Sequence, residues 1–191
     1  MNQPGNLSTM SRSLKNLAVV GSIFLVSCSG GSAAQDGESW NKADQKFVQE
    51  MIPHHEQAVT MSEMVNKTEV SSELADLASE IIKTQAAEIE QMQSFLNEWE
   101  VKSDPHSGHK MSGDESHGMM TDEDMDTLNN SSGAGFEKMW LTLMLAHHNG
   151  AVKMAETVIA EGKDSRVKTL AQNIIGAQQK EISLIKSLLV S

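Results

Sequence analysis

The chain has 191 residues, enough for one domain with a hydrophobic core. Its 26 acidic residues outnumber 15 Lys and Arg, and the formal net charge of −11 excludes a basic nucleic-acid-binding surface while favouring the attraction of cations. The single cysteine excludes a disulfide within the chain, so packing must supply the stability.

Residues 1–27 are predicted to be a bacterial lipoprotein signal peptide. Arg12 and Lys15 precede an apolar run from 17 to 26, which is too short to span a bilayer as a helix. The run ends in Leu-Val-Ser-Cys, which resembles a lipobox, so we expect cleavage before Cys28 and lipidation of that cysteine. An ordinary cleaved signal with a chance cysteine is the alternative. Residues 28–40 would be a flexible tether, and the protein would lie in the cell envelope, on the periplasmic face or the cell surface.

The remainder of the chain contains an internal repeat. When the sequence is shifted against itself by 93 residues, sixteen of the positions from 51 to 89 are identical without a gap. The repeat includes a Met-x-x-His-His motif, which occurs at 51–55 and again at 144–148. A repeated unit of this kind predicts a duplicated structural element.

Each repeat is predicted to form a helical hairpin, with helices over 41–65 and 71–100, then over 135–160 and 164–190. The N-cap candidates are Ser71-Ser72-Glu73 and Asp164-Ser165, and Gly162 is expected to be a C-cap. Pro53 predicts a kink or a late start of the first helix. The hairpins at 41–100 and 135–191 would bury their apolar faces against each other. The predicted fold is therefore all-α, a four-helix bundle forming one domain.

The segment between the repeats, residues 101–134, is expected to be a long flexible loop rather than part of the core, because it is rich in Gly, Ser, Asp and His. It is also rich in Met, for which an unburied segment has no packing reason. Thioether and imidazole are ligands that suit copper, so we expect an auxiliary metal site here. Its candidate ligands are His106, His109, Met111, His117, Met119 and Met120.

Both Met-x-x-His-His motifs lie on the apolar face of their predicted helices, by helical-wheel position. A buried His or Met is more often a core residue than a ligand, but two adjacent His flanked by Met, found twice, favour metal binding. The predicted metal ligands form two sets: Met51, His54, His55 and Met61, and Met144, His147, His148 and Met154.

Four polar residues of the partner helices also point inward on the wheel: Gln85, Glu88, Gln178 and Glu181. One hypothesis is that they hydrogen-bond the histidines of the neighbouring helices and so support the metal ligands. The alternative is that they lie at an end of the bundle, where they reach water.

The ligand types favour copper, with Cu(I) as the preferred state, because zinc gains little from thioether.

No enzyme is predicted: the Glu-x-x-His signature of di-iron sites is absent, and Val59 stands where a zincin motif beginning at His55 needs its second histidine. Two alternatives stay open. One is a ferritin-like di-metal oxidase using Glu88 and Glu181, and the other is a metal-free structural or interaction bundle. The expected partners are the metal ion and the membrane, with a homo-oligomer or a copper-transfer partner left open.

The two motifs and their surroundings resemble the bacterial DUF305 family. Asp44, Phe47 and Trp99 also fit its pattern, whereas Glu137 departs from it, since Asp is commoner there. The resemblance implies a ferritin-like four-helix bundle, and exported members that bind copper and support copper resistance. The stretches that carry it are 51–59 with Met61, Gln85 with Glu88 and Ile89, and 144–152 with Met154.

Overall fold

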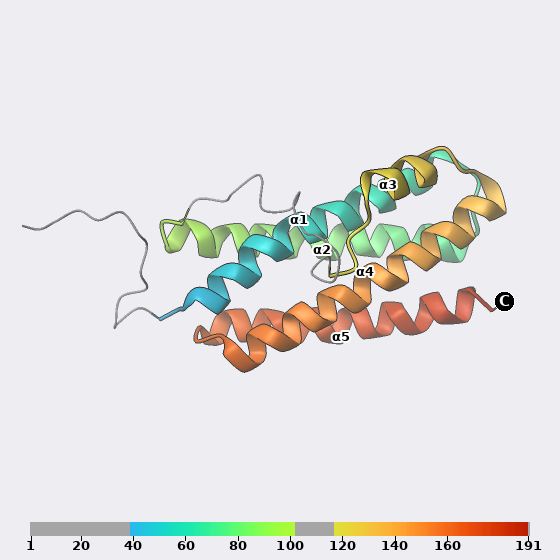
Figure 1. Cartoon of the computed structure of the whole chain (residues 1–191). Coiled ribbons are helices and arrows are strands. Elements are labelled where there is room, and N and C mark those ends of the chain that lie inside the picture. The colour runs from blue at the N-terminus through green and yellow to red at the C-terminus, as the bar shows by residue number, and fades with distance from the viewer. Residues whose placement is uncertain (1–38, 102–116, 191) are drawn as a thin grey trace, which may run out of the picture. The chain divides into compact units, whose positions relative to one another are not determined.

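The structure is a computed structural model that describes residues 39–101 and 117–190. Within these ranges all regular structure is helical, which confirms an all-α bundle (Figure 1). The helices are α1 Lys42–Met64, the short 3-10 helix η1 Val65–Lys67, α2 Ser72–Glu98, α3 Asp122–Asn129, α4 Gly133–Glu161 and α5 Ser165–Leu188. The predicted signal peptide, Cys28, most of the tether, His106, His109 and Met111 lie outside the described residues. None of the described helices is both long and apolar enough to cross a bilayer.

Helices α1 and α2 pack as one hairpin and α4 and α5 as a second, and contact between α1 and α4 joins them. The buried apolar side chains form two clusters. One includes Met51, Phe47 and Met154, and the other includes Met61 and Met144. Along both α1 and α4 the His-His pair falls between residues of the first cluster and residues of the second. The histidines therefore form a polar layer between two apolar parts of the core.

The helix starts follow from side-chain capping. Ser71 accepts a hydrogen bond from the backbone N–H of Leu74, and Asp164 accepts one from that of Arg166, so the first residue of each candidate segment is the N-cap. Helix α1 begins at Lys42 after a capping box and runs through Pro53, so a late helix start is wrong. The cap and the burial of the apolar face outweigh the missing proline N–H.

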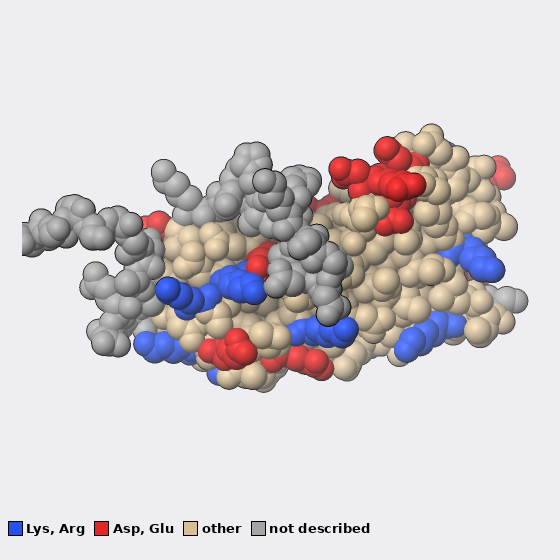
Figure 2. Space-filling view, in the orientation of Figure 1, with Lys and Arg blue, Asp and Glu red and all other residues tan. Residues whose placement is uncertain are grey.

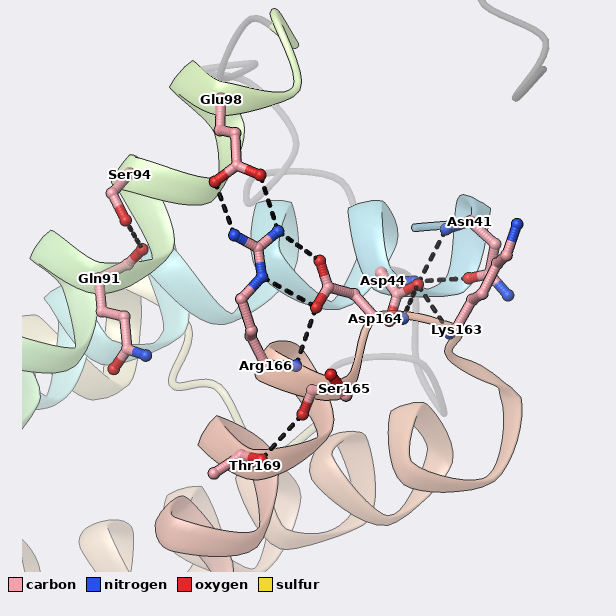
Figure 3. A network of polar contacts seen from close by, with 10 residues as sticks. All are labelled: Asn41, Asp44, Gln91, Ser94, Glu98, Lys163, Asp164, Ser165, Arg166 and Thr169. Carbon is pink, nitrogen blue, oxygen red and sulfur yellow. Dashed lines mark hydrogen bonds and ion pairs between the residues drawn. The ribbon is translucent and has the colours of Figure 1, made fainter. Parts of the chain in front are cut away.

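Each hairpin holds the turn of the other through a carboxylate. Asp44 of α1 accepts hydrogen bonds from the backbone N–H groups of Lys163 (2.8 Å) and Asp164 (3.1 Å), in the turn between α4 and α5 (Figure 3). Glu137 of α4, 93 residues further on, accepts from the backbone N–H and the hydroxyl of Ser71, at the start of α2. These two contacts fix the hairpins relative to each other and so position the residues on α1 and α4.

An ion-pair network lies beside Asp164, at the end of the bundle where Asp44 bonds the turn between α4 and α5. Arg166 donates to both carboxylate oxygens of Glu98 (2.7 and 2.8 Å) and to both of Asp164. Figure 3 shows Arg166 between these two groups, which come from the end of α2 and the start of α5. Its guanidinium lowers the pKa of both carboxyl groups. The network thereby ties α2 to α5.

The segment between the repeats is more ordered than expected. Residues 117–133 include α3, whose Leu128 is fully buried, and Met120 and Met125 pack against the second apolar cluster. A capping box between Thr121 and Asp124 starts the helix. The prediction of a loop without core residues is therefore wrong for this part, because three apolar residues are spaced to cover the bundle.

Gly162 ends α4 as predicted, but with φ −68° and ψ 163°, so it does not adopt the left-handed cap conformation. A Cβ atom there would lie 2.4 Å from Oδ1 of Asp44 and 2.6 Å from the carbonyl oxygen of Val158. We expect Gly162→Ala to lower the free energy of unfolding by about 1–3 kcal/mol through this overlap. In the control Gly176→Ala, where no atom lies within 4 Å, the better helix former should raise it by about 0.5–1 kcal/mol. Urea unfolding of both variants measures the difference, and equal stabilities would contradict the steric account.

Candidate metal centre

Four histidines from α1 and α4 meet in the layer between the two apolar clusters. His54, His55, His147 and His148 are each at most 1% exposed. The rings of His54 and His147 have centroids 3.8 Å apart with 39° between their planes, so these two side chains are in contact across the hairpins. The ring centroids of His55 and His148 lie 6.4 and 6.3 Å from those of His54 and His147 on the same helices. We call His54 and His147 the inner pair and His55 and His148 the outer histidines. The inner pair therefore joins the two predicted ligand sets.

The outer histidines each donate to a carboxylate on the partner helix of their own hairpin. Nε2 of His55 lies 2.8 Å from Oε2 of Glu88, and Nε2 of His148 lies 2.6 Å from Oε2 of Glu181. A carboxylate can only accept, so each Nε2 carries the hydrogen and Nδ1 is left for other use. Hydrogen bonds between the histidines and Glu88 and Glu181, one of the two alternatives left open by the sequence, are thus present.

The inner histidines differ from each other. Nε2 of His54 lies 3.0 Å from the main-chain carbonyl oxygen of His117, whereas neither ring nitrogen of His147 has a hydrogen-bond partner in the described part of the chain. Nδ1 of His54, His55 and His148 also lacks one within those residues. Buried polar atoms without partners are costly and rare, so these nitrogens call for a ligand.

Burial controls the charge of the inner pair. Desolvation lowers the pKa of His54 from 6.5 to about 3, and it also lowers the pKa of His147 well below 6.5, with repulsion from His54 as the next cause. Both imidazoles are therefore neutral at physiological pH. A neutral imidazole keeps one lone pair, which is the form that binds a metal ion.

The four predicted methionine ligands are all buried, but the structure groups them across the repeats. Met51 and Met154 belong to the first apolar cluster, on one side of the histidine layer, and Met61 and Met144 belong to the second, on the other side. Each side of the layer thus has one methionine from α1 and one from α4. The sequence had grouped Met51 with Met61, because spacing along one helix does not show which residues of another helix lie opposite.

Gln85 and Gln178 point inward, as the helical wheel predicted, and are only 1% and 2% exposed. Their amide atoms have no hydrogen-bond partner among residues 39–101 and 117–190, so the expected bonds to histidine are not formed. Each lies three residues, or about 4.5 Å of helix rise, from the glutamate that contacts a histidine. That offset removes them from the level of the imidazoles.

The described part of the auxiliary segment contributes main-chain groups. His117 touches the centre through its carbonyl oxygen, and the backbone N–H and C=O of Met120 both bond the side-chain amide of Gln57. His117 and Met119 have half-buried side chains. Sequence reasoning missed the role of the His117 carbonyl. The one available signal was that Gly150 stands where the first repeat has Gln57.

The donor set fits a soft metal ion. Within the two described ranges, no group of three or more His, Cys, Asp and Glu side chains is arranged to hold a metal, and this holds for the four histidines as well as for Glu88 and Glu181. Neutral imidazole together with buried thioether suits Cu(I), which accepts low coordination numbers. Acidic side chains gather over α3 on the face shown in Figure 2, and its first turn contains Asp122, Glu123 and Asp124. Such a patch attracts cations.

Comparison with known proteins gives one family match. The model of a domain of unknown function, DUF305, matches residues 44–189. A DUF305 protein of Streptomyces coelicolor, described as a candidate secreted protein, is 32% identical, with a TM-score of 0.67 and coverage of 78% of this chain and 92% of that chain. A DUF305 fragment of Deinococcus radiodurans is 25% identical, with a TM-score of 0.71 and coverage of 80% and 98%.

The chain is also similar to CopM, whose Cu(II)-bound structure is 29% identical over 76% of this chain and 95% of that chain, with a TM-score of 0.67. Structures of CopM with Cu(I) and with silver are similar as well. An uncharacterised protein of Acanthamoeba polyphaga mimivirus is 40% identical over 53 residues, which are 28% of this chain and 35% of that protein. This match spans about a third of the mimivirus protein.

Proposed function

Because this chain belongs to the DUF305 family, we propose that its buried histidine layer binds copper, with Cu(I) as the preferred state. The observation that carries the proposal is the contact between His54 and His147, two buried neutral imidazoles with nitrogen atoms that have no partner among the described residues. A bundle without a ligand has no reason to keep such a costly pair. The similarity to CopM, which has been observed with copper and silver, supports the choice of metal.

The ligands proposed for the site are the inner histidines, with thioethers of the flanking methionines completing it. His55 and His148 would be further ligands through Nδ1, each oriented by its glutamate. Met51, Met61, Met144 and Met154 border the layer from both sides. We further propose the His106, His109, Met111, His117, Met119 and Met120 segment as an auxiliary site that captures the ion.

The proposed role is copper sequestration, transfer or resistance in the cell envelope, without catalysis. The predicted lipid anchor at Cys28 would keep the protein at the membrane surface, and the acidic patch would raise the local cation concentration. A copper-transfer partner or a second copy of the chain would receive the ion.

A thermal-shift experiment on the full chain tests this function. A ligand that binds only the folded state must stabilise it, so Cu(I) or Ag(I) at about 100 times its Kd should raise the Tm by about 5–10 °C. The double variant His54→Ala/His147→Ala should lose this rise. Leu74→Ala, which removes a buried side chain away from the histidines, should lower the Tm and yet keep the rise.

Two results would count against the helical site. If the metal left the Tm of the wild-type chain unchanged, a metal-free bundle would be the better description. If the double variant kept the full rise while alanine at the six auxiliary positions removed it, the metal would bind the segment between the repeats instead.

A further inference from the structure

Residues 117–120, His-Gly-Met-Met, form a strap that reaches both α1 and α4 at the level of the histidine layer. Figure 1 shows the end of this segment as the yellow trace that leads into α3. Its first residue contacts His54 through the main-chain carbonyl oxygen, at 3.0 Å from Nε2. The strap therefore reaches the inner pair with a hydrogen-bond acceptor from the backbone.

The strap is fixed to α1 by Gln57. The side-chain amide of Gln57 donates to the carbonyl oxygen of Met120 (2.9 Å) and accepts from its backbone N–H (2.7 Å). Gln57 follows His54 by three positions, so the two side chains lie on neighbouring parts of the same helix surface. Two hydrogen bonds to the backbone of one residue, together with the contact to His54, set the position of the strap along α1.

The strap is also fitted closely to α4, and glycine is required on both sides of that contact. A Cβ atom on Gly150 would lie 1.4 Å from the carbonyl oxygen of His117, and one on Gly118 would lie 2.3 Å from the carbonyl oxygen of Ala146. His117 and Gly118 have φ angles of 46° and 77°, in the left-handed region. Gly150 is thus the residue that lets the His117 carbonyl approach His54.

The strap makes the inner pair asymmetric. The residue 93 positions before Gly150 is Gln57, which holds the strap, so the corresponding positions of the two repeats play different parts. Consequently the ring of His54 has a carbonyl partner, while that of His147 has no hydrogen-bond partner among the described residues. The two repeats therefore supply histidines of the same type but in different hydrogen-bonding states.

A carbonyl oxygen only accepts hydrogen bonds, so Nε2 of His54 must be the protonated nitrogen and Nδ1 must hold the lone pair. We propose that the strap is a positioning element that fixes His54 in this tautomer and thereby assigns Nδ1 of His54 as the metal-binding atom. This inference rests on the proposed copper site for its consequence. The tautomer itself is a property of the metal-free protein. A histidine that binds a metal through one nitrogen commonly donates its other N–H to a carbonyl or carboxylate.

The first test is nitrogen NMR of the histidine side chains in the metal-free full chain. The wild-type spectrum should show His54 with a protonated Nε2 and a bare Nδ1. Gly150→Ala should displace the strap and leave His54 as a mixture of tautomers. Gln57→Leu, which removes both bonds to Met120 without adding bulk at α4, should have the same effect. The control Gly176→Ala makes the same exchange in α5, where no atom lies within 4 Å, and should keep the wild-type pattern.

The second test is Cu(I) affinity, measured against a competing chelator. Loss of the partner that orients a metal-binding histidine costs about 10- to 100-fold in affinity, so both strap variants should bind that much more weakly than Gly176→Ala. A protonated Nδ1 in the wild type would overturn the proposal. So would strap variants that kept both the wild-type tautomer and the wild-type affinity.

These readouts separate the strap from the function it serves. If the wild-type chain showed the expected tautomer but bound neither Cu(I) nor Ag(I), the proposed function would fail and the effect of the strap on His54 would stand. If it bound Cu(I) tightly and the strap variants bound equally well, the copper site would stand and the positioning role would fail.

Discussion

Replacing Asp44 with alanine is expected to lower the free energy of unfolding by about 4 kcal/mol, because it removes a fully buried acceptor of charge-assisted hydrogen bonds. Oδ2 of Asp44 accepts from the backbone N–H groups of Asn41 (2.9 Å), Lys163 (2.8 Å) and Asp164 (3.1 Å). In the alanine variant these donors would lie at the start of α1 and at the α4–α5 turn without an acceptor. The negative charge also lies near the N-termini of α1 and α5, where it is favourable.

Urea unfolding measures this loss, and two variants calibrate it. Asp44→Asn keeps one acceptor oxygen but not the charge, so it should lose less than Asp44→Ala. Glu137→Ala removes the corresponding contact to Ser71, and it should also lose less because Glu137 is only half-buried. A loss below about 1 kcal/mol for Asp44→Ala would mean that water replaces the carboxylate. It would contradict the role assigned to Asp44, which is to clamp the α4–α5 turn to the start of α1.

The inward orientation of the histidines was predictable from the sequence, since it depends only on helical periodicity. The wheel placed His54, His55, His147 and His148 in the apolar stripe, and all four are buried. It also turned Glu88 and Glu181 toward them, where they form the hydrogen bonds. Positions that follow from one helix and its period were therefore accessible without a structure.

Features that depend on packing between distant segments were not accessible. The strap acts through the main-chain groups of His117 and Met120, and backbone atoms leave no side-chain signature in the sequence. The pairing of Met51 with Met154 depends on which levels of α1 and α4 face each other. Gly162 was predicted as a C-cap and does end α4. The sequence did not show that a side chain at this position would overlap Asp44.

The clamp at Asp44 illustrates the boundary between the two cases. The 93-residue offset pairs Asp44 with Glu137 and Ser71 with Asp164, so the correspondence was present in the sequence. The sequence does not show that the contacts cross between the repeats: the carboxylate of each repeat accepts hydrogen bonds from the turn of the other repeat. This crossing follows from the contact between α1 and α4, which also brings His54 to His147. The same packing therefore accounts for the stability of the bundle and for the candidate site.

The metal-free protein is expected to lose stability steeply as the pH falls from 6.5 to 4.5. The folded-state pKa of His54 is about 3, and burial also lowers that of His147. Below pH 6.5 the unfolded chain binds protons that the folded chain does not, so the free energy of unfolding must decrease as the pH falls. For His54 alone the loss over these two pH units is about 2.3 kcal/mol, and His147 adds to it in the same direction. Above about pH 7.5 both imidazoles are neutral in both states, and this contribution is fully present.

Urea unfolding of the metal-free chain at a series of pH values measures this loss. The lowered pKa values of Asp164 and Glu98 remove stability mainly below pH 4.5, because the carboxyl groups of the unfolded chain take up most of their protons there, so they add little over this range. The variant His54→Leu/His147→Leu should be nearly insensitive to pH over this range. Bound Cu(I) should protect the wild type until protons displace it, because a coordinated nitrogen cannot take a proton. Equal stability of the metal-free wild type at pH 6.5 and 4.5 would show that the two histidines are hydrated or charged in the folded state, and the neutral buried pair that the copper site needs would then be wrong.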